Sequence, residues 1–182
     1  MTATTIPEVK LITPARHQDN RGFLSEVFNQ RNLQDGGITD NFVQENHTYS
    51  VSAGTVRGLH YQAPPSPQAK LVRVLRGAIF DVAVDVRKSS TTFGQHFGVE
   101  LNTENWSQLY IPEGFAHGFC TLEPDTEIAY WASSYWDPEL DCGIAWDDPD
   151  LAIPWPVDPA SAVLSEKDRQ LPLLREISSH FA

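Results

Sequence analysis

The feature that most constrains how this chain can fold is a series of short segments in which the side chains alternate in polarity. Turn-forming residues separate these segments. The clearest is LVRVLRGAIFDVAVDVR at 71–87, which predicts a strand, a turn at Arg76-Gly77 and a second strand. Three further segments are expected to hold strands, at 57–62, 106–122 and 126–136. Many short strands at this spacing are typical of a β-sandwich or a β-barrel, with helices confined to the edges.

The chain is expected to form a single domain over residues 1–182, because it has a suitable length and neither a repeat nor a low-complexity run. One peripheral helix is predicted to begin within LSEKDRQLPLLR at 164–175. Its start carries Ser165-x-x-Asp168, a possible capping box, and Pro172 limits its length.

Composition and charge argue against several classes of function. A net charge of −11 repels phosphate backbones, so we expect no nucleic-acid partner. A small anion can still bind where a few cationic side chains line a cleft, because salt screens distant charges beyond about 10 Å. The opening MTATTIPEVK does not resemble a signal peptide, and no apolar run is long enough to span a membrane. With two cysteines, Cys120 and Cys142, and no CxxC pair, the simplest expectation is a cytoplasmic protein without a membrane partner.

The second strand of 71–87 presents an unusual face. Alternation places the apolar Phe80, Val82, Val84 and Val86 on one side, and Asp81, Ala83 and Asp85 on the other. Two interpretations of the acidic face remain open: it contacts solvent, or it lines a wet cavity that holds a polar ligand.

His60, in RGLHYQ, is the most informative single residue. Side chains two residues apart lie on the same face of a strand, so His60 shares a face with Gln62. The same rule places Gln68 on one face with Lys70. A histidine, an amide and an ammonium are therefore predicted to converge on one cavity. A structural histidine, a metal ligand and a general base are the three interpretations of His60.

The metal interpretation is the weakest of the three. PEGFAH at 112–117 has the P-x-G-x-x-H shape of the second cupin motif, but the first motif reads His60-Tyr61-Gln62 and lacks its second histidine. Two histidines without a nearby acid make a poor metal site. A general base needs an orienting carboxylate, and spacing alone does not choose among Asp81, Asp85, Asp141 and Asp168.

Six motifs in order carry a family resemblance: VRGLHYQ, QAKLVRV, IFDVAVDVR, QLYIPEGFAHGF, GIAWDDP and LSEKD. Together with NRGF at 20–23 they span nearly the whole chain, and the chain resembles the dTDP-4-dehydrorhamnose 3,5-epimerase family. The resemblance implies a mainly β fold, a cupin-like jelly-roll barrel with a few short peripheral helices. It also implies a homodimer in which N-terminal strands cross to the partner, and epimerisation of a dTDP-linked 4-keto-6-deoxy sugar without metal or organic cofactor.

The resemblance also assigns roles to four catalytic residues. His60 matches the base, and Asp168 matches the acid that orients it. Tyr130 matches the proton donor, and Lys70 matches the cation beside the developing C4 oxyanion. Asp81 remains a second, less favoured partner for His60.

Eight further residues match family positions around the ligand. They are Arg21, Glu26, Gln44, Asn46, Arg57, His117, Asp141 and Lys167. Arginine forks suit diphosphate oxygens, which explains how an acidic protein binds an anion. For His117 a structural histidine bonded to the backbone remains an equal alternative.

Three departures from the family pattern bear on the substrate. Trp131 stands where the family has a lysine, Trp136 replaces a tyrosine, and Asp141 replaces a glutamate. Alternation places Trp131 opposite Tyr130, toward the outer face of the barrel or a dimer contact, whereas Trp136 is expected to stack on the base. Two alternatives therefore stay open: an epimerase that inverts one carbon or acts on another nucleotide sugar, and a non-catalytic nucleotide-sugar-binding cupin.

Overall fold

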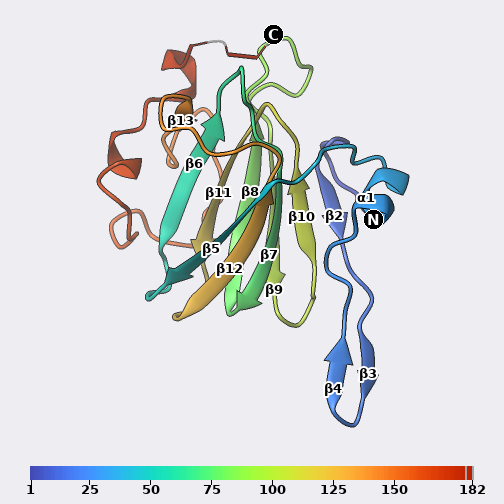
Figure 1. The fold of residues 1–182 in the computed structure, drawn as a ribbon. Coiled ribbons are helices and arrows are strands. Elements are labelled where there is room, and N and C mark those ends of the chain that lie inside the picture. Colours follow the sequence, from blue (N-terminus) through green and yellow to red (C-terminus); the bar gives the residue numbers. More distant parts are fainter. Residues whose placement is uncertain (179, 182) are drawn as a thin grey trace.

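The structure, a computed structural model, describes residues 1–178, 180 and 181, and strands dominate these residues (Figure 1). Their six-stranded antiparallel sheet has the order β1-β2-β10-β7-β12-β5, with bounds Thr2–Ala3, Lys10–Ile12, Gln108–Ile111, Lys70–Arg76, Thr126–Ala132 and Gln44–Ser50. A five-stranded antiparallel sheet has the order β13-β6-β11-β8-β9, with bounds Asp141–Gly143, Val56–Gln62, Phe115–Thr121, Ala78–Asp85 and His96–Asn102. The hairpin of β3 (His17–Asp19) and β4 (Gly22–Leu24) stands apart from both sheets.

The main apolar core joins these two sheets. Val72, Val74 and Ile128 from the six-stranded sheet belong to one buried cluster with residues of the five-stranded sheet, such as Ile79 and Phe115. Interdigitation of two inner faces is what a jelly roll requires, and the alternation of each strand supplies those faces. The predicted mainly β fold with a few short peripheral helices is confirmed.

The outer face of the five-stranded sheet is covered by the C-terminal segment. Val82 and Val84 of β8 pack with Leu174 and Ile177 in a second buried cluster. Figure 1 shows this segment, in red, running beside β6 and β13. The packing of this segment brings Asp168 against β6, more than one hundred residues away in the sequence.

The predicted helix within 164–175 is wrong as an α-helix. The structure has two 3₁₀ turns there, Asp168–Gln170 and Leu174–Glu176. The Asp168 N–H does donate to Ser165 Oγ at 3.1 Å, which is the first half of a capping box. Leu171 is extended at φ −66° and ψ 142°, because a residue before proline avoids the helical region.

An α-helix forms instead near the N-terminus, at α1 (Gln30–Asp35). Asn29 caps it, with its side-chain oxygen accepting from the N–H groups of Arg31 and Asn32. The helix buries Leu33 against the outer face of the six-stranded sheet. This short helix was not predicted, and it ends at Gly36, within the turn-forming segment QDGG at 34–37.

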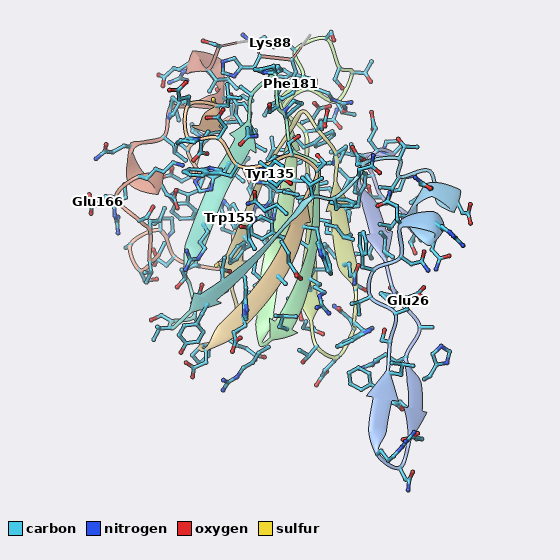
Figure 2. All side chains as sticks on the ribbon, in the orientation of Figure 1. Glu26, Lys88, Tyr135, Trp155, Glu166 and Phe181 are labelled. Atoms are coloured by element: carbon cyan, nitrogen blue, oxygen red, sulfur yellow. The ribbon has the colours of Figure 1, made fainter. Side chains whose placement is uncertain are left out.

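The β3–β4 hairpin projects away from the body of the barrel (Figure 1). Two apolar side chains on it are exposed, Phe23 at 51% and Leu24 at 74%. Figure 2 shows Glu26 on the arm that leads to this hairpin, on the opposite side of the view from Glu166.

The acidic face of β8 does not contact solvent, because Asp81 and Asp85 are both fully buried. Asp85 accepts hydrogen bonds from Arg87, Ser90 and Thr92, so its role is structural. Asp81 lies behind His117 and contacts it directly. The solvent interpretation of this face is therefore wrong, and the cavity interpretation holds only through His117.

Candidate active site

A cavity of about 410 Å³ opens between the inner faces of the strands and the C-terminal segment. Seven of the predicted site residues line it: Arg57, His60, Lys70, His117, Tyr130, Lys167 and Asp168. They come from four strands, β6, β7, β11 and β12, and from the C-terminal segment, which are remote from one another in the sequence. The fold therefore gathers all four predicted catalytic side chains at one place.

β6 positions His60 by an unusually close approach to β11. Gly58 has φ +123°, and a Cβ there would lie 2.6 Å from the Gly118 Cα. Only glycine tolerates both conditions. The register of the two strands shifts between His117 and Phe119, and before that shift His60 lies directly opposite His117. Irregular pairing of this kind often turns side chains toward a site.

His60 and Asp168 form a hydrogen-bonded pair, with 2.6 Å between Nε2 and Oδ1. The His60 side chain is 30% exposed, whereas that of Asp168 is 4% exposed. Burial disfavours the charge of Asp168, but hydrogen bonds from His60, Ser165 and the Gly58 backbone outweigh it and hold the pKa of this carboxyl below its ordinary value. A carboxylate only accepts hydrogen bonds, so Nε2 carries the hydrogen and Nδ1 is left to take a proton.

Lys70 supplies a buried cation beside this pair. Burial lowers the pKa of its ammonium to about 8, although the negative charges of Asp141 and Asp81 oppose that shift. Its Nζ donates to the His60 carbonyl at 3.4 Å, and it lies 5.9 Å from the centre of the Tyr130 ring. Lys70 is therefore a cation close to both proposed proton-transfer groups.

Tyr130, on β12, points to the cavity, and the next residue points away from it. Burial raises the pKa of the Tyr130 phenol, so the group keeps its proton at neutral pH and can donate it. Trp131 stacks on Phe28 with 5.3 Å between ring centres, and Arg73 lies 5.3 Å from its ring. The expected position of Trp131 on the outer face is confirmed.

His117 is bonded to a carboxylate rather than to the backbone. Its Nε2 lies 2.7 Å from Asp81 Oδ1, so neither the backbone alternative for His117 nor the pairing of Asp81 with His60 holds. Burial lowers the pKa of His117, which keeps its imidazole neutral. The site thus contains a second histidine–carboxylate pair, deeper than the first.

The predicted binding residues divide into three groups. Arg57 and Lys167 line the cavity, and Lys167 donates to Asp141 at 2.5 Å. Asp141 also accepts from the Trp136 indole at 3.4 Å, which places both residues at the edge of the cavity. Trp136 itself is 56% exposed.

Gln44 and Asn46 share a face of β5 with Thr48, which lines the cavity, but they do not line it themselves. Gln44 donates to Asn46 and accepts from the Trp136 N–H at 3.0 Å. Their side chains are therefore placed to position the loop that carries Trp136.

Arg21 and Glu26 lie away from the cavity of their own chain. Arg21 pairs with Asp19 on the projecting hairpin, and Glu26 accepts from Asn29 and Asn32. Within one chain, neither Arg21 nor Glu26 lines the cavity at which the predicted catalytic residues meet.

The predicted convergence of amide side chains on the cavity is wrong. Gln62 is buried and binds the loop after β12, where it donates to Tyr135 O at 3.0 Å and accepts from Asp137 N at 2.9 Å. Gln68 donates to Ser134 O in the same loop. These glutamines therefore shape the cavity edge instead of contacting a ligand.

Sequence reasoning missed several residues that line the cavity, among them Thr48, Thr55, Phe119 and Ser165. Thr48 and Phe119 could have been found, because each lies two residues after a predicted site residue, Asn46 or His117, on the same strand face. Ser165 belongs to the LSEKD motif but was considered only as a helix cap.

Among residues 1–178, 180 and 181, no group of three or more His, Cys, Asp or Glu side chains is arranged to hold a metal ion. In the same part of the chain, no helix is long and apolar enough to cross a membrane. The expected absence of a cofactor stays a prediction.

The family model of dTDP-4-dehydrorhamnose 3,5-epimerase matches residues 3–176. The chain belongs to the dTDP-4-dehydrorhamnose 3,5-epimerase family. A curated member of the family from Sinorhizobium fredii is 49% identical over 97% of this chain and 90% of its own length. The predicted family and enzyme class, an epimerase, are confirmed.

Solved structures of this epimerase family extend the comparison. The enzyme from Legionella pneumophila in complex with dTDP-4-keto-L-rhamnose is 46% identical, with a TM-score of 0.92 over 97% of this chain and 93% of that one. ChmJ, a 3'-monoepimerase from Streptomyces bikiniensis in complex with dTDP-quinovose, is 33% identical, with a TM-score of 0.88 over 96% of this chain and 88% of that one. The family fold therefore serves both double and single epimerisation.

Proposed function

We propose that this protein inverts C3 and C5 of dTDP-4-keto-6-deoxy-D-glucose to give dTDP-4-dehydro-L-rhamnose, in dTDP-L-rhamnose synthesis. The observation that carries the proposal is the His60–Asp168 pair in one cavity with Lys70 and Tyr130. C3 and C5 both flank the C4 ketone, which already acidifies their C–H bonds. A base, a cation for the enolate oxygen and an acid on the other face are then sufficient.

Each inversion begins with His60. Its Nδ1 takes the proton from the carbon, and the electron pair of the C–H bond moves into the enolate, whose charge collects on the C4 oxygen. Asp168 keeps the imidazole in the required tautomer and stabilises the imidazolium that forms, as carboxylates do in histidine-based catalysis. Lys70 offsets the oxyanion.

Tyr130 completes the step from the opposite face. Its hydroxyl gives a proton to the carbon, the C4 ketone returns, and the carbon has changed configuration. Solvent then returns a proton to the phenolate and removes one from the His60 imidazolium, so the balance closes without a cofactor. The raised pKa of the Tyr130 phenol favours return to the protonated form between steps.

The nucleotide end is assigned to the cavity edge. Arg57 and Lys167 are the cations that would bind the diphosphate, and exposed Trp136 offers a flat surface for the base. The backbone N–H groups of Trp136 and Asp137 donate to Gln44 and Gln62, and these hydrogen bonds hold that surface before the ligand arrives. Pre-organisation of this kind reduces the entropy cost of binding.

We further propose a homodimer in which the β3–β4 hairpin of one protomer carries Arg21 and Glu26 to the cavity of its partner. The projecting hairpin and its exposed apolar side chains, Phe23 and Leu24, support this arrangement. Arg21 is exposed, and among the described residues its side chain pairs with Asp19 alone, so it is available to an anion on another protomer. The cytoplasmic location is likewise a proposal.

The test is an incubation with dTDP-4-keto-6-deoxy-D-glucose in D₂O, followed by NMR to locate the deuterium. Label at both C3 and C5 in an L-configured product is the expected result. Label and inversion at one carbon alone would assign the monoepimerase activity that ChmJ represents within the family. No label at either carbon would overturn the proposed reaction and favour a binding role.

A further inference from the structure

Asp81 is a buried carboxylate that its one hydrogen-bond partner does not neutralise. It is fully buried, and its Oδ1 accepts from His117 Nε2 at 2.7 Å. Among the residues that the structure describes, its Oδ2 is a buried side-chain oxygen with no hydrogen-bond partner. A carboxylate oxygen left in this state is costly, so its retention calls for a physical reason.

His117 does not cancel this charge. Burial lowers the pKa of the imidazole, so the ring is neutral, donates one hydrogen to Asp81 and leaves the negative charge in place. The charge can therefore act on a cation nearby. Lys70 is such a cation, because its ammonium lines the cavity that His117 also lines, and the negative charge of Asp81 favours its protonated form.

Asp81 and Asp141 are the two carboxylates whose charges favour the Lys70 ammonium, and they differ in their own partners. Asp141 from β13 also favours the Lys70 ammonium, but it is paired with Lys167, whose own charge opposes it. Asp81 acts on Lys70 from β8, and among the residues that the structure describes it forms no ion pair with a lysine or an arginine. The other titratable groups that line this cavity are Arg57 and His60 on β6, His117 on β11, Tyr130 on β12, and Lys167 and Asp168 of the C-terminal segment.

We propose that Asp81 is a positioning residue for the epimerisation, which with His117 holds Lys70 in its ammonium form beside the C4 oxygen of the substrate. The inference rests on the proposed function, because it assigns a reason for the cation that the enolate requires. Asp81 does not touch the substrate in this arrangement. It acts through Lys70.

If this inference holds, loss of the Asp81 charge should reduce activity more at high pH than at low pH. The pKa of Lys70, about 8, lies just above neutral pH, so a modest loss of favourable charge would deprotonate it under working conditions. Replacing Asp81 by a neutral residue removes an interaction that raises this pKa. The ammonium, and the stabilisation of the oxyanion, would then be lost at a lower pH.

The experiment compares Asp81→Asn with Asp85→Asn. Both aspartates are fully buried and share one face of β8, but Asp85 is held by Arg87, Ser90 and Thr92 instead of facing the cavity. For Asp81→Asn we expect the basic limb of the kcat–pH profile to move down by about one unit. The loss in kcat should be about fivefold near pH 8, should approach about tenfold at higher pH, and should be small near pH 6. Asp85→Asn should leave the limb where it is.

A titration without substrate separates this inference from the proposed function. The chain has four lysines, Lys10, Lys70, Lys88 and Lys167, so the side-chain NMR signals of isotope-labelled lysine can be assigned by substitution. Asp81→Asn should lower the Lys70 midpoint, whether or not the chosen sugar is the substrate. A wild-type protein that turns over nothing would overturn the proposed reaction alone.

Two outcomes would overturn the role of Asp81: an unchanged Lys70 midpoint in Asp81→Asn, or the same shift in Asp85→Asn. If Asp81→Asn does not fold, Asp81→Glu takes its place. Glutamate keeps the charge, so a Lys70 midpoint close to that of the wild type supports the inference, and a midpoint as low as that of an uncharged site contradicts it. Lys70→Arg should abolish the basic limb, since arginine does not deprotonate in this range.

Discussion

His60 lies directly opposite His117 across β6 and β11, and each imidazole is bonded to its own carboxylate. The two pairs differ in access. His60 is partly exposed in the cavity and is proposed to exchange protons with the substrate, whereas His117 and Asp81 are buried. Two similar pairs on neighbouring strands can therefore do different work, one moving protons and the other maintaining charge.

Replacing His60 by alanine should abolish turnover and leave the fold intact. The reason is its proposed role as the base, and the loss in kcat is expected to be at least about 10²-fold. Turnover of the dTDP sugar and thermal unfolding of the same preparation are the two measurements. Near-normal turnover in a folded variant would remove His60 from the mechanism.

Replacing Tyr130 by phenylalanine should separate proton removal from inversion. The base is untouched, so deuterium from D₂O should still enter C3 or C5, but the carbon should regain its original configuration because no donor faces it from the other side. NMR of the recovered sugar reports both label and configuration. Inverted product at the wild-type rate would show that another group supplies the proton.

Replacing Trp136 by alanine should raise KM for the dTDP sugar by about tenfold, with a smaller change in kcat. Stacking of a base on an aromatic side chain contributes about 1–3 kcal/mol. Trp131→Phe is the matched control, because Trp131 packs on the outer face with Phe28. Equal effects of the two substitutions on KM would contradict the assignment of Trp136 to the base.

Mixing two inactive variants tests the exchange of the hairpin. Arg21→Ala and His60→Ala should each be impaired as homodimers. In a mixed dimer, the site that keeps His60 receives Arg21 from the other protomer, so one of the two sites is complete. Recovery of up to about half the wild-type activity on subunit exchange is expected, and no recovery in a verified mixed dimer would exclude the exchange.

Acid should weaken the fold through Asp85. Burial disfavours its charge, yet hydrogen bonds from Arg87, Ser90 and Thr92 prevail and hold its pKa below the ordinary value. Its contribution is therefore present above an unfolded pKa of about 4 and is lost as the pH falls through the lower folded value. Asp85→Asn should lower the free energy of unfolding by about 3 kcal/mol at pH 7, because it breaks a buried ion pair.

Urea unfolding at pH 7 and at pH 3 measures that difference. It should shrink at pH 3, because this pH lies below the ordinary aspartate pKa of about 4, so the unfolded chain takes up a proton that folded Asp85 resists. A difference that stays constant would assign the loss to packing rather than to charge.

The strands and the family were predictable from the sequence because both rest on local patterns. Alternation in 71–87 is independent of what packs against it, and it correctly separated Tyr130 from Trp131. The partner of each carboxylate was not predictable, because Asp168 reaches β6 from a remote segment and Asp81 was a plausible rival. Spacing does not report contacts between residues so far apart.

The errors have physical causes as well. The segment at 164–175 carries a helix-start signal, but Pro172 and packing against the sheet leave it in short turns. Gln62 was assigned to the cavity because alternation predicts the face of the strand on which a side chain lies. It does not predict which group the side chain will bind. Its amide instead binds the backbone of a loop that no pattern had placed nearby.

The pairing of His60 with Asp168 also orders events during synthesis. The base belongs to an early strand, while its carboxylate follows all the strands of both sheets along the chain. Domains begin to form while the ribosome is still adding residues. The strands of both sheets therefore leave the ribosome before the carboxylate that His60 binds. Under the proposed mechanism, catalysis begins only when the C-terminal segment has been made and has docked.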